Sequence, residues 1–352
     1  MKKSLEGILA VFCLVMLLLY PGLALSGARN GLLLWSNVIL PTLLPFMVCV
    51  GAVAALGGIP LVTRPFFPVL SGLLGLSRQG SFVFMSGLLC GYPMGAKTTG
   101  DFLREGRIGL REGRLLLAIS NHPSPMFLLG FVMPRMLSSW GGDASCPLWL
   151  VMLSLYLPVI PIGLWAGRVY GVWGTELSSG PGAAAPDRAS DFGPAAADHP
   201  SGSDPSAANQ TSRYGSDSAS PPFSFDAHLM SCFETMVKIG GYVMLFSIAA
   251  IFIQTLSPLS EKSSCFILGI TEITTGIHAV SKSWPSETAG AVLAFITAFG
   301  GISGIFQTKS VLKNAGLSIR HYVLWKICHG TLSCGTFILL SQAEALASLL
   351  PL

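Results

Sequence analysis

Long apolar runs, each bounded by short polar segments, dominate the chain. Six runs hold enough consecutive apolar residues to cross the roughly 30 Å hydrocarbon core of a bilayer as helices. They cover residues 8–25, 32–56, 115–134, 147–170, 229–256 and 322–340. Two more apolar regions, 61–96 and 265–307, are interrupted by Gly, Pro or a polar turn. The pattern therefore predicts an all-α polytopic membrane protein in which the interrupted regions form paired half-helices.

Composition agrees with this prediction, because 51% of the 352 residues are hydrophobic and only 11% are charged. Ordinary soluble domains have about a quarter charged residues. The first run follows Lys2 and Lys3, which fits a signal-anchor helix over residues 1–28, although its ALSGA ending also fits a cleavable signal peptide. The eight cysteines show no CxxC spacing. We therefore expect a lipid-embedded protein without metal, cofactor or nucleic-acid partner.

The segment 174–228 differs in kind from the rest of the chain. It is rich in Gly, Ala, Pro, Ser and Asp, and it carries seven acidic residues against two arginines. Such a composition offers too little apolar surface to offset the entropy of ordering. We expect a disordered acidic linker between a first transmembrane repeat, 29–173, and a second, 229–352.

The two halves show weak internal similarity. A shift of 209 positions places Gly91 on Gly300 and aligns residues 102–112 with residues 311–321 without a gap. Counting crossings from a cytoplasmic N-terminus, with residues 61–96 re-entrant, keeps the arginines of segment 104–114 inside and makes the halves inverted. The same count places Lys309, Lys313 and Arg320 outside, against the charge bias. A second hairpin that crosses fully would bring that loop inside.

The breaks in the apolar regions are the candidate binding site. Non-helical backbone at membrane depth occurs where it is buried in protein or lines a wet cavity, and matching breaks in two repeats mark transporter sites. Free N–H groups at such breaks favour anions, and Lys97 would add a full charge. Lys97 could equally be an interfacial lysine. The candidate binding residues are Gly91, Tyr92, Gly95, Lys97, Asn121, Ser124, Gly300, Gly301, Ser303, Gln307 and Thr308.

Two further features allow two interpretations each. The prolines of SNHPSP, residues 120–125, remove backbone donors, so this stretch is a cavity wall or a kinked packing helix. Glu272 lies in an apolar run, where an acid is costly. It is a candidate for ion or proton coupling, or a structural hydrogen-bond partner of Thr274 or Thr275.

An enzyme is the less favoured alternative. GISG, residues 301–304, matches the GxSG of rhomboid-type intramembrane proteases, with His329 as a conceivable base. Four residues match easily in a glycine-rich chain, and catalysis would not explain why both halves are broken alike.

Several segments resemble the sporulation integral membrane proteins of the YlbJ, or SpoVV, type. They are SGLLCGYPMGAK (86–97), LREGRI (103–108), SNHPSPMFLLGFV (120–132), KIGGYVMLFSI (238–248), ITEITTG (270–276) and GGISG (300–304). The resemblance covers nearly the whole chain except the linker. It implies repeats of the nucleoside-recognition, or gate, type and a role in endospore formation. It also implies passage of dipicolinate from mother cell toward forespore, in the outer forespore membrane.

Dipicolinate is a small aromatic dicarboxylate, which suits half-helix N-termini and lysines such as Lys97 and Lys309. Uncharged nucleosides would instead be held by polar side chains such as Asn121 and Gln307. A non-transporting morphogenetic protein that recruits partners through the linker is a third reading.

Overall fold

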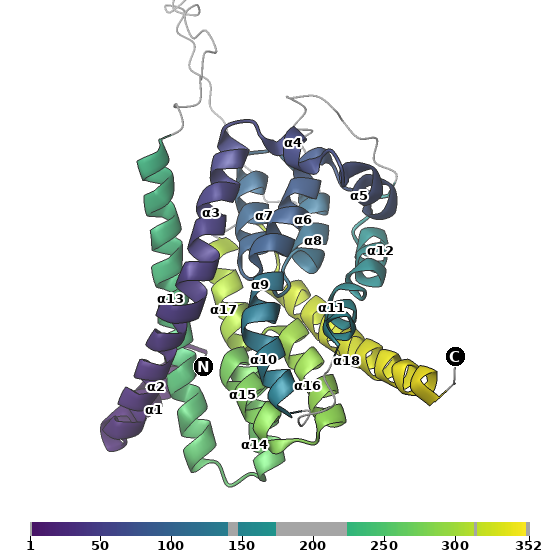
Figure 1. Cartoon of the computed structure of the whole chain (residues 1–352). Coiled ribbons are helices and arrows are strands. Elements are labelled where there is room, and N and C mark those ends of the chain that lie inside the picture. Colours follow the sequence, from purple (N-terminus) through teal and green to yellow (C-terminus); the bar gives the residue numbers. More distant parts are fainter. Residues whose placement is uncertain (1, 140–146, 174–223, 313–314, 350–352) are drawn as a thin grey trace, which may run out of the picture.

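The computed structural model describes residues 2–139, 147–173, 224–312 and 315–349 (Figure 1). All regular secondary structure in these residues is helical, as the apolar pattern predicts. Five helical segments are long and apolar enough to cross a membrane, or six if one bent helix pair is counted as a span. The predicted linker lies outside the described residues from 174 to 223. The second half begins with α13 at Phe225, four residues before the predicted boundary.

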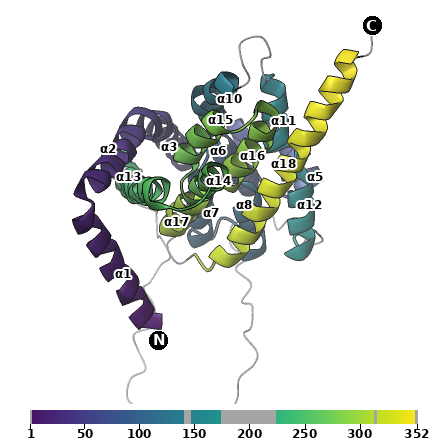
Figure 2. The ribbon, with the colours of Figure 1, turned by 90° about the horizontal axis from the view of Figure 1, so that it is seen from below.

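The N-terminal region differs from the expected two crossings. α1 (Lys2–Leu19) ends before Pro21, and one continuous candidate span, Pro21–Ala55, follows. This span consists of α2 (Pro21–Leu34), a π-helical turn, η1 (Trp35–Ile39), and α3 (Leu40–Ala55). Proline cannot donate to the α1 ladder but fits the first turn of a new helix. Residues 21–28 therefore belong to the next helix, and α1 runs off to the side of the bundle (Figure 2).

The first half contains a re-entrant hairpin, α6 (Arg78–Cys90) and α7 (Met94–Arg104). Its two open ends lie together, because Arg107 donates a hydrogen bond to Gln79 at 3.2 Å. The hairpin begins at α6 and not at residue 61, since α5 and α6 meet at 103°. The preceding short helices are α4 (Ile59–Thr63) and α5 (Phe67–Leu74).

A broken crossing follows this hairpin. α8 (Leu110–Ile119) starts beside the hairpin's open end, and α10 (Met133–Ser139) lies at the opposite end of the bundle (Figure 1). Residues 120–124 interrupt the path between them, as their prolines predict. The crossing resumes with α9 (Pro125–Phe127) and a second π-helical turn, η2 (Leu128–Val132). The chain then returns through α11 (Leu148–Tyr156) and α12 (Val159–Val169).

The second half repeats this order from the opposite end of the bundle. After α13 (Phe225–Leu256) comes a hairpin of α14 (Glu261–Thr271) and α15 (Ile273–Ser283), whose open ends meet where Ser283 donates to Glu261 at 2.7 Å. A second broken crossing, α16 (Ser286–Phe299) and α17 (Gly301–Leu312), leads to α18 (Ile319–Leu349). Hairpin α6–α7 enters from the top of Figure 1 and hairpin α14–α15 from the bottom. The halves are inverted.

The structural equivalents are not the ones that the shift of 209 positions proposes. Gly91 lies at the tip of a hairpin, whereas Gly300 interrupts a crossing. The hairpin tip at Gly91 corresponds to Glu272, and the break at residues 120–124 corresponds to Gly300 and Gly301. Glycine permits the positive φ angles found at Gly91 and Gly300, so both kinds of break carry glycine and a short glycine match aligned the wrong pair.

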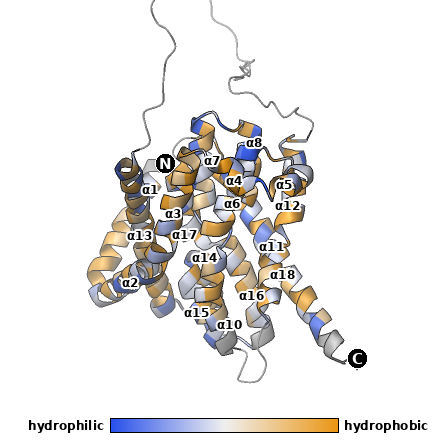
Figure 3. Cartoon of the chain, turned by 45° about the horizontal axis from the view of Figure 1, so that its top comes forward, coloured by the Kyte–Doolittle hydropathy of each residue, from blue (hydrophilic) through white to orange (hydrophobic). Residues whose placement is uncertain are grey.

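The loop after α17 lies at the arginine-rich end, which corrects the expected outside placement. A Cβ added at Gly100 would lie 3.3 Å from the Leu312 carbonyl oxygen, and one at Gly113 would lie 3.8 Å from Leu317. Hydrophilic residues gather around the adjoining ends of α7 and α8, while apolar residues cover the sides of the bundle (Figure 3). Basic residues at this end include Arg64, Arg104, Arg107, Arg111, Arg114, Lys309 and Arg320. By the positive-inside rule, we expect this end to face the cytoplasm.

Candidate functional site

The four chain breaks meet at one cavity, between the breaks and helices α3 and α13. Each hairpin tip and each broken crossing contributes to the lining, and α3 and α13 complete the wall. The space between the lining atoms totals about 650 Å³, counting the part that is open to the surroundings. The lining residues that come from the breaks include Gly91, Tyr92, Ser124, Glu272, Ile273, Thr274, Gly300, Gly304 and Gln307.

The tip of the first hairpin touches the second broken crossing. Tyr92 donates its hydroxyl to the carbonyl oxygen of Thr297, at the end of α16. A Cβ added at Gly300 would lie 3.1 Å from the Tyr92 ring. One added at Gly91 would lie 2.7 Å from the backbone nitrogen of Ser124. Absent side chains at these two glycines therefore let three breaks approach each other.

The break in the first crossing places Ser124 at the cavity. Its hydroxyl accepts a hydrogen bond from the Phe127 amide at 3.2 Å and so caps α9, while Pro125 occupies the first turn. Both interpretations of SNHPSP contain part of the answer. Ser124 lines the cavity, whereas Asn121 and His122 are buried behind it.

Glu272 caps the helix that starts at the tip of the second hairpin. Its carboxylate accepts hydrogen bonds from the amides of Thr274 and Thr275 at 3.1 and 2.8 Å. Both threonine hydroxyls also donate to it, at 2.5 and 2.8 Å. The side chain is only 2% exposed, yet it belongs to the cavity lining. The structural interpretation agrees with this geometry, and a coupling role stays a prediction.

The electrostatics of the cavity come mainly from helix ends. α7, α15 and α17 each begin at a break, and helix N-termini carry a partial positive charge. The polar side chains of the lining are Thr42, Tyr92, Ser124, Thr274 and Gln307. Among the described lining residues Glu272 is the one acid, and none is Lys or Arg. The cavity therefore suits a polar solute but holds no basic side chain of its own.

Six of the predicted site residues line the cavity, namely Gly91, Tyr92, Ser124, Glu272, Gly300 and Gln307. Three of the remaining six serve packing or local bonds. A Cβ at Gly95 would lie 2.1 Å from the Ser120 carbonyl oxygen, and one at Gly301 would lie 3.3 Å from the Ile273 amide. Ser303 accepts a hydrogen bond from Gln307 at 3.1 Å.

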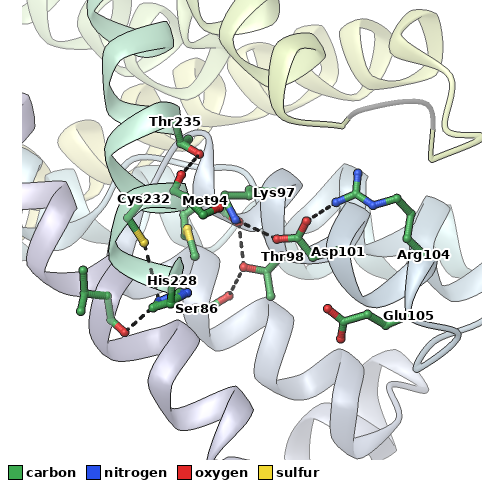
Figure 4. A network of polar contacts seen from close by, with 12 residues as sticks. Ser86, Met94, Lys97, Thr98, Asp101, Arg104, Glu105, His228, Cys232 and Thr235 are labelled. Carbon is green, nitrogen blue, oxygen red and sulfur yellow. Dashed lines mark hydrogen bonds and ion pairs between the residues drawn. The ribbon is translucent and has the colours of Figure 1, made fainter. Parts of the chain in front are cut away.

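Lys97 does not reach the cavity. It forms an ion pair with Asp101 at 2.8 Å, and Asp101 also pairs with Arg104 (Figure 4). The lysine side chain lies on the side of α7 near Cys232 and Thr235 of α13 (Figure 4). Its charge is balanced within its own helix, so the structure does not support a direct role at the cavity.

Asn121 and Thr308 belong to an inner polar cluster that adjoins the cavity at Tyr92. The Asn121 side-chain amide donates to the Tyr322 hydroxyl at 2.6 Å and to the Thr308 hydroxyl at 2.9 Å. Lys326, which the sequence analysis missed, donates to the Asn121 carbonyl oxygen at 2.9 Å and is 1% exposed. The available signal was a lysine in the middle of an apolar helix, where a charge is expensive.

The protease alternative finds no support in the described side chains. Ser303 is bonded to Gln307, and the His329 ring nitrogen Nε2 lies 2.8 Å from the Leu155 carbonyl oxygen. A serine nucleophile and its base should instead lie within hydrogen-bond reach of each other. Within the described parts of the chain, no group of three or more His, Cys, Asp and Glu side chains could hold a metal ion.

No family model and no solved structure matches the chain. A curated protein does: the sporulation integral membrane protein YlbJ of Bacillus subtilis (strain 168) is 24% identical over 330 residues. These residues cover 88% of this chain and 76% of YlbJ. The chain is related to the YlbJ-type sporulation membrane proteins. Because the match covers 88% of this chain, it extends into both halves. The name of YlbJ states its membrane location and its link to sporulation.

Proposed function

We propose that the chain is a membrane transporter of endospore formation that carries dipicolinate from mother cell toward forespore. The observation that carries the proposal is the meeting of four chain breaks, two from each inverted half, at one cavity. Irregular backbone at this depth is expected where a solute binds and the two halves rock around it. The sporulation context rests on the similarity to YlbJ, and we place the transporter in the outer forespore membrane.

In this proposal the cavity receives the solute between the hairpin tips. The N-terminal ends of α7 and α17 attract its carboxylates, since that of α15 is already capped by Glu272. Glu272, in the lining, would oppose an anion while ionised, and a proton on its carboxylate would remove that repulsion. We therefore assign Glu272 the role of proton-coupling group.

A nucleoside-type transporter is the second candidate, and a specific observation favours it. The described lining carries hydroxyl and amide groups but no Lys or Arg side chain. Tyr92, Ser124, Thr274 and Gln307 could hydrogen-bond the sugar and base of an uncharged nucleoside. Competition between the two solutes in one assay decides between the candidates.

The test uses the purified protein in lipid vesicles with labelled dipicolinate, and labelled uridine as the competing solute. Gly304 is the position to change, because it lines the cavity and an added Cβ would meet open space there. Gly304→Leu should fill the cavity and abolish uptake. Gly335→Leu is the matched control, since Gly335 of α18 also faces open space but lies outside the lining.

The outcomes separate the candidates. The proposal is supported if dipicolinate uptake is lost in Gly304→Leu and kept in Gly335→Leu. Uridine uptake with the same pattern, and none of dipicolinate, supports the second candidate. Uptake of neither solute would contradict transport of both and favour a morphogenetic membrane protein. Uptake unaffected by Gly304→Leu would remove the cavity from the transport path.

A further inference from the structure

Lys326 is a buried basic residue that lies outside the cavity lining. Its side chain is 1% exposed, in the middle of α18. Its ammonium group donates to the Asn121 carbonyl oxygen at 2.9 Å and lies 4.9 Å from the centre of the Tyr92 ring. An ammonium has three N–H donors, and among the described residues it has one hydrogen-bond acceptor and no ion pair. Burying a charge without a counter-ion is costly.

Other polar groups of the same cluster also lack partners. The Asn121 side-chain oxygen and both ring nitrogens of His122 are buried without a hydrogen bond. His122, the residue after Asn121, is 1% exposed, and its ring packs edge-on against Phe84 and Tyr156. Buried polar atoms in native proteins nearly always have a partner, so the unpaired ring N–H of His122 points to a missing acceptor. The Asn121 oxygen is itself an acceptor and needs a donor. An amine and a ring N–H can both donate to the same acceptor.

We infer that Lys326 is the cation that holds a carboxylate group of the solute, in an inner site formed with Asn121 and Tyr322. The inference rests on the proposed function and names the charge that the cavity lacks. Tyr92 connects the two places, since it lines the cavity and its ring also lies against Lys326. Tyr92 is therefore the gate between the cavity and the inner site.

The structure holds this gate closed. The Tyr92 hydroxyl is bonded to the Thr297 carbonyl oxygen, and its ring rests on Gly300. A carboxylate in the cavity meets Lys326 once this ring moves aside. A planar aromatic acid suits this movement, because it can stack on the Tyr92 ring while its carboxylate contacts the Lys326 ammonium group.

The experiment compares binding and uptake in the same variants. Thermal unfolding of the purified protein is measured with and without dipicolinate or picolinate, and uptake of labelled dipicolinate is measured in vesicles. Lys326→Met should lower uptake at low solute by about tenfold to a hundredfold, as expected for a lost hydrogen bond to a charged group. It should also abolish the carboxylate-induced stabilisation. Lys326→Arg should keep part of the uptake and part of the carboxylate-induced stabilisation.

Lys238→Met is the matched control. Lys238 also belongs to a long apolar helix, but it is exposed and paired with Glu234, so both readouts should stay as in the unsubstituted protein. Asn121→Asp provides a variant that keeps Lys326. It supplies a carboxylate inside the cluster, and we expect higher thermal stability without solute and a smaller shift with it.

Each result bears on the inference. If Lys326→Met binds and transports dipicolinate as the unsubstituted protein does, Lys326 is not the cation, and the proposed transport still stands. If the unsubstituted protein does not take up dipicolinate but picolinate stabilises it through Lys326, the inference stands and the substrate is wrong. If neither carboxylate stabilises the unsubstituted protein, the inference is overturned. An unchanged stability and an unchanged carboxylate shift in Asn121→Asp would also contradict it, even if Lys326→Met failed to fold.

Discussion

Lys97 and Lys326 are two lysines of central helices whose surroundings are opposite. Lys97 lies near α13, is 15% exposed, and forms an ion pair with Asp101, one helical turn further along α7 (Figure 4). Lys326 is fully buried. Its ammonium group donates a hydrogen bond to the Asn121 carbonyl oxygen and lies over the Tyr92 ring. The first charge is neutralised by its own helix and needs nothing further. The second has no acid beside it in the described structure, and this makes it the stronger candidate for meeting an anionic solute.

Glu272 shows a third way to hold a buried charge. Two backbone amides at the start of α15 and two hydroxyl groups surround its carboxylate. Hydrogen bonds from a helix N-terminus stabilise an anion without a cation nearby. Residues close in sequence thus stabilise the charges of Lys97 and Glu272, whereas the contacts of Lys326 come from distant parts of the chain.

The largest effect should come from Gly95→Val, because Gly95 lies on α7 between the surroundings of Lys97 and the inner cluster of Asn121 and Lys326. Gly95 lies on the side of α7 that packs on the first crossing, and even a Cβ would lie 2.1 Å from the Ser120 carbonyl oxygen. The clash is with backbone, so α7 must shift beside Asn121. We expect a loss of about 3 kcal/mol or more in stability. Membrane abundance and thermal unfolding measure it, and normal values for both would contradict the packing described here.

Glu272→Ala should have the next largest effect. It removes the cap of α15, at a cost of about 2 kcal/mol in the free energy of unfolding. Glu272→Gln keeps one acceptor oxygen but not the charge, and it should fold better than the alanine variant. Uptake driven by a pH gradient, compared with uptake without one, then tests coupling. If Glu272→Gln transports with an unchanged response to the gradient, Glu272 is a structural cap alone.

Tyr92→Phe should have a smaller effect, and in the opposite direction. The variant keeps the ring against Lys326 but loses the hydrogen bond to Thr297, which is worth about 0.5–1.5 kcal/mol. If opening of this gate limits transport, the rate should rise roughly twofold to tenfold. Initial rates of dipicolinate uptake measure the change. Tyr92→Leu, which also removes the ring, is the comparison, and an equal rate in all three proteins would exclude Tyr92 as a gate.

Much of the fold could be predicted from the sequence because its determinants are local. Apolar runs define the long helices, and Gly or Pro marks the breaks at Gly91, residues 120–125 and Gly300. The hairpin tip at Glu272 was not predicted, because an acid in an apolar run does not by itself indicate a break. The equivalence of the repeats could not be read in the same way. Whether a broken segment turns back or crosses depends on which ends meet, such as Gln79 with Arg107.

The candidate site likewise contains residues that local sequence indicates and residues that depend on long-range contacts. Residues at the breaks, such as Tyr92 and Ser124, do line the cavity. Lys97 was a reasonable anion contact from sequence, since it follows a break by a few residues, but the helical spacing to Asp101 already offered it a partner. The setting of Lys326 requires contact with Asn121, 205 positions away. No local pattern encodes that contact.

The smallest effect should come from Lys97→Gln. The side chains of Lys97 and Asp101 are 15% and 28% exposed. Asp101 keeps Arg104 as a partner when the lysine charge is removed, so the loss should stay close to the roughly 0.2–1 kcal/mol of an exposed pair. We expect stability within about 1 kcal/mol of the unsubstituted protein and uptake within roughly twofold. Thermal unfolding and dipicolinate uptake are measured beside Lys326→Met at equal abundance. A loss of uptake in Lys97→Gln as large as that in Lys326→Met would undo the contrast between the two lysines, because a charge balanced by Asp101 should not be needed by the solute.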